Sequence, residues 1–256
     1  MMRPRRANRF QLPPKNNPVA SPSFPWSLVP CFFWRYLLTM QEPVQLAGLI
    51  LAAGDSTRMG TDKAMLPWPP PPSDATDPPR HTLLSAALLA FDPLTRLNVV
   101  VAGRNADAIS ITVGACGAYL VHNPSPDNGQ FSSLQIGLRD LLDRGCNAAI
   151  ITPVDCPPLS PASLERLHHA FLGALTAGFW AVAPEHDGKH GHPLLVSRDL
   201  IDVFLDAPIT GNARQVLHLH ASRVVYVPVP EPLATAGLNT PQDYAAQGFE
   251  SPAPTL

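Results

Sequence analysis

The pattern of apolar and polar positions divides the chain into alternating strand-like and helix-like segments. Short apolar runs bounded by turn residues predict buried strands at Leu46 to Leu51, Leu97 to Ala102, Ala118 to His122, Ala148 to Thr152, Phe179 to Ala183 and Val224 to Val229. Helical spacing predicts helices at Leu83 to Phe91, Ser132 to Leu142, Leu164 to Leu172 and Leu200 to Leu205, with Ser160 and Pro161 as N-cap and first helical residue before the third helix. This alternation predicts an α/β fold, a Rossmann-like three-layer sandwich with a mainly parallel sheet. In such sheets ligands bind beyond the carboxyl ends of the strands, so we expect the functional residues in those loops.

Composition and charge exclude two classes of function. The chain has 256 residues, 45% of them hydrophobic. It contains no uninterrupted run of 18 apolar residues, which argues against a membrane span. A formal net charge of −2 gives no sign of a nucleic-acid-binding surface. The four cysteines have no metal-type or redox-type spacing, as expected for a protein of the reducing cytoplasm.

The two ends and one internal segment are expected to lie outside the main fold. Residues 1–39 hold six of the 18 Lys and Arg and no Asp or Glu, and they have no periodic apolar face. We interpret them as a disordered leader, with Met40 as an alternative start, and we expect one globular domain over residues 40–250 followed by a tail at 251–256. Seven of the 13 residues from 67 to 79 are proline, which indicates a surface loop or insertion. A variable loop without a role is favoured over one that closes on a ligand.

The segment after the first strand has the composition of a phosphate-binding loop. Leu51 is followed by the small residues Ala52, Ala53 and Gly54, and cations follow at Arg58 and Lys63. Small residues let backbone N–H groups approach phosphate oxygens, while the guanidinium and the ammonium supply charge. The glycine spacing fits neither a Walker A loop nor a dinucleotide fingerprint. The alternative is an ordinary strand-to-helix turn with solvated charges.

Two further segments carry candidate polar groups. Ser132 and Ser133 at a helix start are expected either to cap the helix or to meet a ligand, and Gly129 permits close approach of one. Asp155, at the tip of an apolar strand, offers the hard oxygen that Mg²⁺ prefers. Near the C-terminus Asn239 precedes a helix start in which Thr240 is the expected cap and Asp243 closes the capping pattern.

These motifs occur in an order that resembles the MobA-like nucleotidyltransferases. Leu-Ala-Ala-Gly from Leu51, then Arg58-Met59-Gly60 and Lys63, are similar to the signature of that family. Asn123-Pro124 with the segment from Gly129 to Leu134 resembles its nucleotide-binding loop, and Gly191-His192-Pro193 resembles a segment near the acceptor in the molybdenum cofactor cytidylyltransferase branch. The similarity runs from about Leu46 to about Tyr244.

The resemblance implies a fold of the nucleotide-diphospho-sugar transferase type and a role for each motif. Nucleotide binding is implied for Leu51, Ala52, Ala53, Gly54, Arg58, Lys63, Asn123, Gly129, Ser132 and Ser133; acceptor binding for Gly191, His192 and Pro193; Mg²⁺ binding for Asp155 and Asn239; and catalysis for Arg58, Lys63 and Asp155. Many relatives carry Asp where this chain has Asn239, which makes the second metal ligand less certain than the first.

The expected activity is the transfer of a nucleoside monophosphate to a phosphorylated acceptor, with release of pyrophosphate. Ala53 in place of a second glycine resembles the cytidylyltransferase branch and favours CTP, with molybdopterin as acceptor. The partners implied are the NTP, the acceptor, and a molybdoenzyme apoprotein or its chaperone. Alternatives are a sugar-phosphate or alcohol-phosphate nucleotidyltransferase, a non-catalytic cofactor-binding or delivery protein, and an oxidoreductase, against which the missing glycine fingerprint counts.

Overall fold

The computed structural model describes residues 43–70 and 80–247. The expected leader at 1–39, most of the proline-rich segment and the tail at 251–256 lie outside these residues. The described residues from Val44 onward belong to one compact unit. Within the described part of the chain, no helix combines the length and the apolar character needed to cross a membrane.

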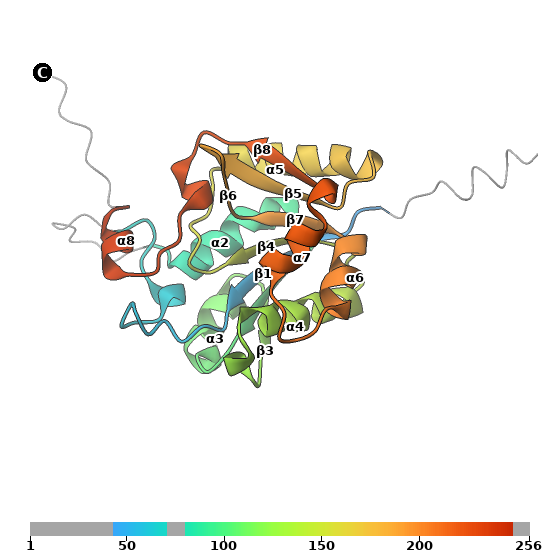
Figure 1. Ribbon diagram of the computed structural model, residues 1–256. Coiled ribbons are helices and arrows are strands. Elements are labelled where there is room, and N and C mark those ends of the chain that lie inside the picture. The colour runs from blue at the N-terminus through green and yellow to red at the C-terminus, as the bar shows by residue number, and fades with distance from the viewer. Residues whose placement is uncertain (1–42, 71–79, 248–256) are drawn as a thin grey trace, which may run out of the picture. The chain divides into compact units, whose positions relative to one another are not determined.

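An eight-stranded sheet forms the middle layer (Figure 1). Its strands are β1 (Leu46–Ala52), β2 (Asn98–Ala102), β3 (Tyr119–His122), β4 (Ala148–Pro153), β5 (Ala181–His186), β6 (Lys189–His190), β7 (Leu194–Ser197) and β8 (Val224–Pro228). They are arranged in the order β3-β2-β1-β4-β7-β5-β6, and β8 pairs with β5. The pairs β1–β2, β1–β4, β2–β3 and β5–β8 are parallel, whereas β7 runs antiparallel to both β4 and β5 and β6 runs antiparallel to β5. The expectation of a mainly parallel sheet is confirmed.

Helices cover both faces of the sheet and give it two separate apolar layers. One layer packs α2 (Leu83–Phe91), α3 (Ala106–Ala115) and α5 (Pro161–Thr176) against side chains such as Ile50 and Val100. The other packs α4 (Gln130–Asp143), α6 (Arg198–Asp206) and α7 (Ala213–Leu219) against side chains such as Leu49 and Val101. Because successive strand residues point to opposite faces, the uniformly apolar β1 and the buried β2 serve both layers. Figure 1 shows these helices around the central strands, with the short α8 (Pro241–Ala245) at the end of the described chain.

Short helical turns complete the connections. They are η2 (Lys63–Met65), η3 (Asp92–Leu94), η4 (Pro126–Asn128), η5 (Ala221–Arg223) and η6 (Pro232–Thr235).

All six strands and all four helices expected from the sequence are present, with ends that shift by a few residues. The sequence pattern missed α3, α7, β6 and β7. The α3 segment is rich in β-branched residues, which favour strands, yet Ile109 and Val113, four residues apart, are buried on one helical face. The β7 segment is only four residues long and follows Pro193 directly, which leaves no alternating pattern to read.

The order of the strands positions the loops where a ligand is expected. From β1 the chain moves outward through β2 to β3, then returns by α4 to place β4 on the other side of β1. The loops that follow β1 and β4 therefore diverge, and a crevice opens beyond the carboxyl ends of these two strands.

Candidate functional site

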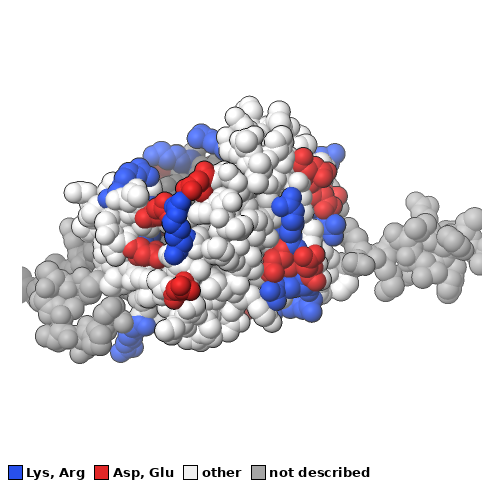
Figure 2. Space-filling view, turned by 90° about the horizontal axis from the view of Figure 1, so that it is seen from below, with Lys and Arg blue, Asp and Glu red and all other residues white. Residues whose placement is uncertain are grey.

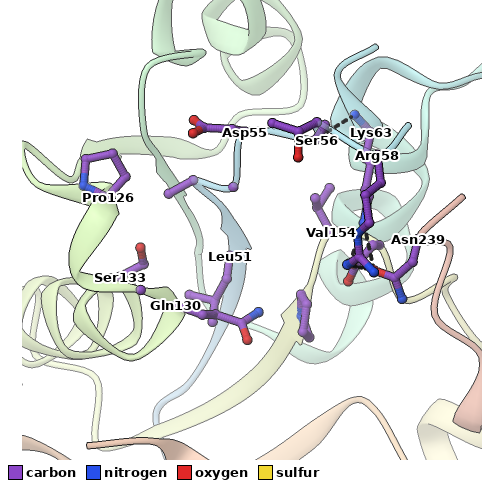
Figure 3. A pocket seen from close by; sticks show the side chains of 16 residues that line it. Leu51, Asp55, Ser56, Arg58, Lys63, Pro126, Gln130, Ser133, Val154 and Asn239 are labelled. Carbon is purple, nitrogen blue, oxygen red and sulfur yellow. Dashed lines mark hydrogen bonds and ion pairs between the residues drawn. The ribbon is translucent and has the colours of Figure 1, made fainter. Parts of the chain in front are cut away.

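A cavity of about 380 Å³ lies at this crevice, between the loop after β1, the start of α4, the loop after β4 and the segment before α8. Figure 3 shows Arg58, Lys63, Val154 and Asn239 on one wall and Pro126, Gln130 and Ser133 on the other. The residues that line it are Leu51, Ala53, Gly54, Asp55, Ser56, Thr57, Arg58, Lys63, Pro126, Gly129, Gln130, Ser133, Pro153, Val154, Asp155 and Asn239.

The loop after β1 is folded around Ser56. Its backbone has φ of +50°, a left-handed conformation that is uncommon for a residue with a side chain and is often found at functional sites. The Ser56 carbonyl accepts hydrogen bonds from the backbone N–H of Met59 and Gly60 at 3.0 and 3.2 Å, and its hydroxyl accepts one from the backbone N–H of Lys63 at 3.1 Å. Ser56 therefore fixes where the loop returns to the sheet and where Lys63 begins.

A second set of contacts ties the same loop to the segment that follows β2. Asn105 donates to the carbonyl of Ala52 at 3.0 Å and to the carboxylate of Asp62 at 2.8 Å. The other carboxylate oxygen of Asp62 accepts from the backbone N–H of Ala64 at 3.0 Å and caps η2. At Gly103 an added Cβ would lie 2.7 Å from the carbonyl oxygen of Ala53, so only glycine allows this close approach of backbones.

Lys63 is the centre of the polar cluster in the cavity. Its ammonium lies 2.9 Å from the Asp155 carboxylate and 3.0 Å from the side-chain oxygen of Asn239, and Arg58 donates to that same Asn239 oxygen at 3.3 Å. The Lys63 residue is only 8% exposed, so its charge is stabilised by these two oxygens rather than by water. Figure 3 shows Arg58, Lys63 and Asn239 pointing toward one another.

Asn239 reaches the cluster because the C-terminal segment is anchored on both sides of it. The backbone N–H of Leu238 donates to the Asp155 carbonyl at 2.8 Å, and the backbone N–H of Asn239 donates to the Asp243 carboxylate at 3.0 Å. Asp243 also accepts from the N–H of Thr240, whose hydroxyl caps α8 in return, as the sequence predicted. Asp155 and Asn239 are thus brought together from positions 84 residues apart (239 − 155).

The expectation that Ser132 and Ser133 cap a helix is wrong. Helix α4 begins earlier, at Gln130, and its N-cap is Gly129, with φ of +87° and no side-chain capping bond. Both serines are buried inside the first turns, where their hydroxyls accept hydrogen bonds from the buried amide of Asn123 at 3.0 and 2.9 Å. Asn123 therefore holds the first turn of α4 against the end of β3, and of these residues only Gly129 and Ser133 line the cavity.

The remaining expected residues do not line the cavity. Ala52, Asn123 and Ser132 support its walls without lining it, and neither do Gly191, His192 and Pro193 line it. The Gly191 and His192 backbone N–H groups donate to the carbonyls of Pro184 and Ala234. Burial lowers the pKa of His192, while a hydrogen bond to the Ile151 backbone and the charge of Asp155 act in the opposite direction. His192 is therefore near Asp155, which follows β4, although His192 itself lies in the connection between β6 and β7.

Sequence reasoning missed several lining residues and one bridge. Asp55, Ser56, Thr57, Pro126, Gln130, Pro153 and Val154 line the cavity without having been predicted. Arg104, after β2, pairs with Asp55 and with Asp127, both at 2.7 Å. Acidic and basic side chains also lie next to one another on the face in Figure 2, without a large region of one sign. The sequence signal that could have found Arg104 is its position directly after β2. Because β2 is parallel to β1, the loops after both strands lie at the same edge of the sheet.

The donor set suits a divalent cation that is shared with a ligand. Asp155 supplies a carboxylate and Asn239 an amide oxygen, and both converge on one ammonium within 3.0 Å. Among the described residues there is no group of three or more His, Cys, Asp or Glu that could hold a metal ion without help. One or two protein oxygens completed by phosphate oxygens and water is the usual arrangement for Mg²⁺. Burial raises the pKa of the neighbouring Cys156 thiol, which disfavours the thiolate needed for a nucleophile or a metal ligand.

Comparisons with known proteins identify the family to which the chain belongs. Residues 48–224 match the model of the family described as MobA-like NTP transferase domain. A probable molybdenum cofactor guanylyltransferase of Mycolicibacterium paratuberculosis is 28% identical over 208 residues, which are 81% of this chain and 97% of the relative. The molybdenum cofactor cytidylyltransferase of Escherichia coli is 26% identical over 170 residues, 66% of this chain and 79% of the relative.

Solved structures show the same fold at low identity. Rv0371c from Mycobacterium tuberculosis has a TM-score of 0.61 at 22% identity and covers 79% of this chain and 97% of its own. A complex of Rv0371c with manganese has a TM-score of 0.55 at 20% identity, over 80% and 98%. A nucleotidyl transferase from Methanothermobacter has a TM-score of 0.61 at 21% identity, over 79% and 95%.

Proposed function

Because the chain belongs to the MobA-like NTP transferase family, we propose that it transfers CMP from CTP to molybdopterin and releases pyrophosphate. The observation that carries the proposal is the convergence of Lys63, Arg58, Asp155 and Asn239 at one end of the cavity. Two cations beside two oxygen ligands suit the triphosphate of a nucleotide with its divalent ion. The names of the relatives support molybdopterin as the acceptor.

The wall opposite the cations suits the nucleoside. Leu51, Ala53 and Gly54 at the end of β1 line the cavity, as do Gly129 and Ser133 at the start of α4. Backbone groups at Ala53 and Gly54 and at the free N-terminus of α4 are donors and acceptors for a base or a phosphate. In the proposal Ala52, Asn123 and Ser132 act indirectly, since they hold these walls, and the Gly191 to Pro193 segment contributes to the acceptor side.

The proposed reaction needs positioning and charge neutralisation more than covalent help. An oxygen of the acceptor phosphate attacks the α-phosphorus of CTP, the new P–O bond forms, and the bond to the β-phosphate oxygen breaks so that pyrophosphate leaves with the bonding electrons. Arg58 and Lys63 stabilise the negative charge on the α-phosphate and the leaving group. The acceptor phosphate is ionised at neutral pH, so no general base is required.

A divalent cation, Mg²⁺ in this proposal, would be held by Asp155 and Asn239 and would neutralise charge on the phosphate oxygens. The Lys63 ammonium now contacts both of these oxygens, so this arrangement requires Lys63 to turn from them toward phosphate. Its flexible stem allows such a movement.

GTP is the second candidate donor, because the relative of Mycolicibacterium paratuberculosis, like one of Rhodobacter capsulatus, is named a guanylyltransferase. Ala53 supports CTP, since it lines the cavity and its methyl group narrows a wall that glycine would leave open. The cysteine spacing favours a cytoplasmic location for the reaction, which stays a prediction.

The test is to incubate the purified protein with Mg²⁺, molybdopterin and each NTP in turn, and to measure pyrophosphate and the dinucleotide product. The proposal expects CTP to give the highest kcat/KM, with no pyrophosphate when the acceptor is omitted. Preference for GTP would replace the cytidylyltransferase with a guanylyltransferase. Nucleotide binding without turnover for any NTP would favour a non-catalytic cofactor-binding protein.

A further inference from the structure

We propose that Arg104 is a positioning residue for the nucleotide, because its guanidinium ties together the two loops that form opposite walls of the cavity. The inference rests on the proposed function and extends it to a residue outside the motifs that suggested that function. Arg104 itself does not line the cavity. We expect it to act through the loops it joins.

The contacts of Arg104 reach both walls. One terminal nitrogen, Nη1, lies 2.9 and 2.7 Å from the two carboxylate oxygens of Asp55 in the loop after β1, and Nη2 lies 2.7 Å from Asp127 in η4. Planar guanidinium groups make such multiple contacts with good geometry. In Figure 3 Asp55 and Pro126, the neighbour of Asp127, lie at the same end of the cavity.

The two loops have few other constraints on each other. Among the described residues, no hydrogen bond or ion pair joins residues 53–60 directly to residues 124–130. Asp55, Asp127 and Gly129 are all exposed, so little packing holds this end of the cavity. The spacing between the walls there depends on Arg104.

Charge gives a second reason for the bridge. Asp55 lines the cavity proposed to receive a triphosphate, and Asp127 follows Pro126, which also lines it. Without Arg104 both would repel the incoming anion, an effect that depends on salt because the groups are exposed. Loss of Arg104 would therefore weaken nucleotide binding through both geometry and charge, while Lys63 and Asp155 stay in place for the chemical step.

The chain offers a matched control. Arg198 pairs with both carboxylate oxygens of Asp202 at 2.8 and 2.9 Å on α6, and the two arginine side chains are 56% and 57% exposed. Arg198 is not among the residues that line the cavity. A surface ion pair without a role in binding contributes little, so Arg198→Met measures that background.

The experiment measures CTP and GTP binding by isothermal titration calorimetry with Mg²⁺, together with kcat at saturating substrate. It uses the full chain and the variants Arg104→Met, Arg104→Lys, Asp127→Asn, the double variant Arg104→Met/Asp127→Asn, and Arg198→Met. We expect Arg104→Met to raise Kd about five- to tenfold with kcat changed less than about twofold, and Arg104→Lys to recover part of the loss. The double variant should be no worse than Arg104→Met alone, because both changes break the same bridge.

Other results would contradict either the role of Arg104 or the proposed function. If Arg104→Met binds nucleotide as Arg198→Met does, or if the effects of Arg104→Met and Asp127→Asn on Kd add, Arg104 does not position the nucleotide. Failure of the unmodified protein to bind any NTP would instead overturn the proposed function. Circular dichroism and melting temperatures of all variants identify any that fail to fold, and Arg104→Lys then serves in place of Arg104→Met.

Discussion

Replacing Asp155 with Asn tests the centre of the proposed site, because it removes a charge and almost no volume. The carboxylate pairs with Lys63 at 2.9 Å, and the two side chains are 27% and 11% exposed. The introduced amide would still offer an oxygen to the ammonium, and the Asn239 oxygen would remain at 3.0 Å. The variant should therefore fold, with Lys63 in a weaker set of contacts.

The expected loss of stability lies between that of an exposed and a buried ion pair. Exposed pairs contribute up to about 1 kcal/mol, and removing one partner of a fully buried pair costs about 3 to 5 kcal/mol. For this partly buried pair we expect about 1 to 2 kcal/mol, because a charge-to-dipole hydrogen bond replaces the lost attraction. In a domain of this size each kcal/mol lowers Tm by about 2 to 4 °C. Differential scanning calorimetry of Asp155→Asn should show this shift, and Asp202→Asn, at an exposed pair, should change Tm less.

The effect on catalysis should be much larger than the effect on stability. A neutral amide is a poor ligand for Mg²⁺ compared with a carboxylate, so we expect pyrophosphate release to fall at least about a hundredfold at limiting Mg²⁺. Raising the Mg²⁺ concentration should recover part of the rate, because the cation's weaker binding is overcome by mass action. A folded Asp155→Asn protein with near-normal activity at limiting Mg²⁺ would refute the assignment of Asp155 as the metal ligand.

Three further changes test other parts of the structure. Ala53→Gly should shift the ratio of kcat/KM for CTP over GTP toward GTP without reversing it, because the start of α4 also shapes the cavity; an unchanged ratio would show that Ala53 does not select the base. Gly129→Ala should lower stability by about 1 kcal/mol in a denaturant titration and raise the Kd for CTP, since φ is +87° there, whereas Gly173→Ala, in a helix with open space around it, should not. Partial burial raises the pKa of Glu231, but hydrogen bonds from Ser160 and Ser163 outweigh it and hold the pKa below the ordinary 4.5. Its contribution to stability is therefore present above about pH 4.5 and is lost as the pH falls through the lower, folded-state pKa, so Glu231→Gln should flatten the acid limb of Tm against pH.

The fold could be predicted because the alternation of apolar strands and amphipathic helices is strong over most of the chain. Strands β1, β2 and β4, in the parallel part of the sheet, are built from largely apolar runs that can be read without tertiary information. What the pattern could not reveal depends on contacts between distant segments. Strand β7 is a strand because β4 and β5 supply hydrogen-bonding partners on both sides of it, and its own four residues carry no such signal.

The candidate site, like the fold, could be predicted from the sequence only in part. Lys63, Asp155 and Asn239 were expected at one centre, and their convergence follows from the loops after β1 and β4 together with the capped start of α8. Ser132 and Ser133 were expected either to cap the helix or to meet a ligand. The helix begins earlier, at Gln130, and the buried amide of Asn123 donates to both hydroxyls. A side chain that acts across 9 or 10 residues leaves no local pattern.

The central place of β1 in the sheet has a consequence for synthesis of the protein. Its residue Leu46 pairs with Ala148, which a ribosome adds 102 residues later (148 − 46). At a synthesis rate of about 5 to 20 residues per second, roughly 5 to 20 seconds pass before β4 is available to pair with the second edge of β1. The nascent chain therefore exposes a strand that is buried along its whole length in the folded domain for longer than most folding steps take. A chaperone that binds extended apolar segments would protect it from aggregation in that interval.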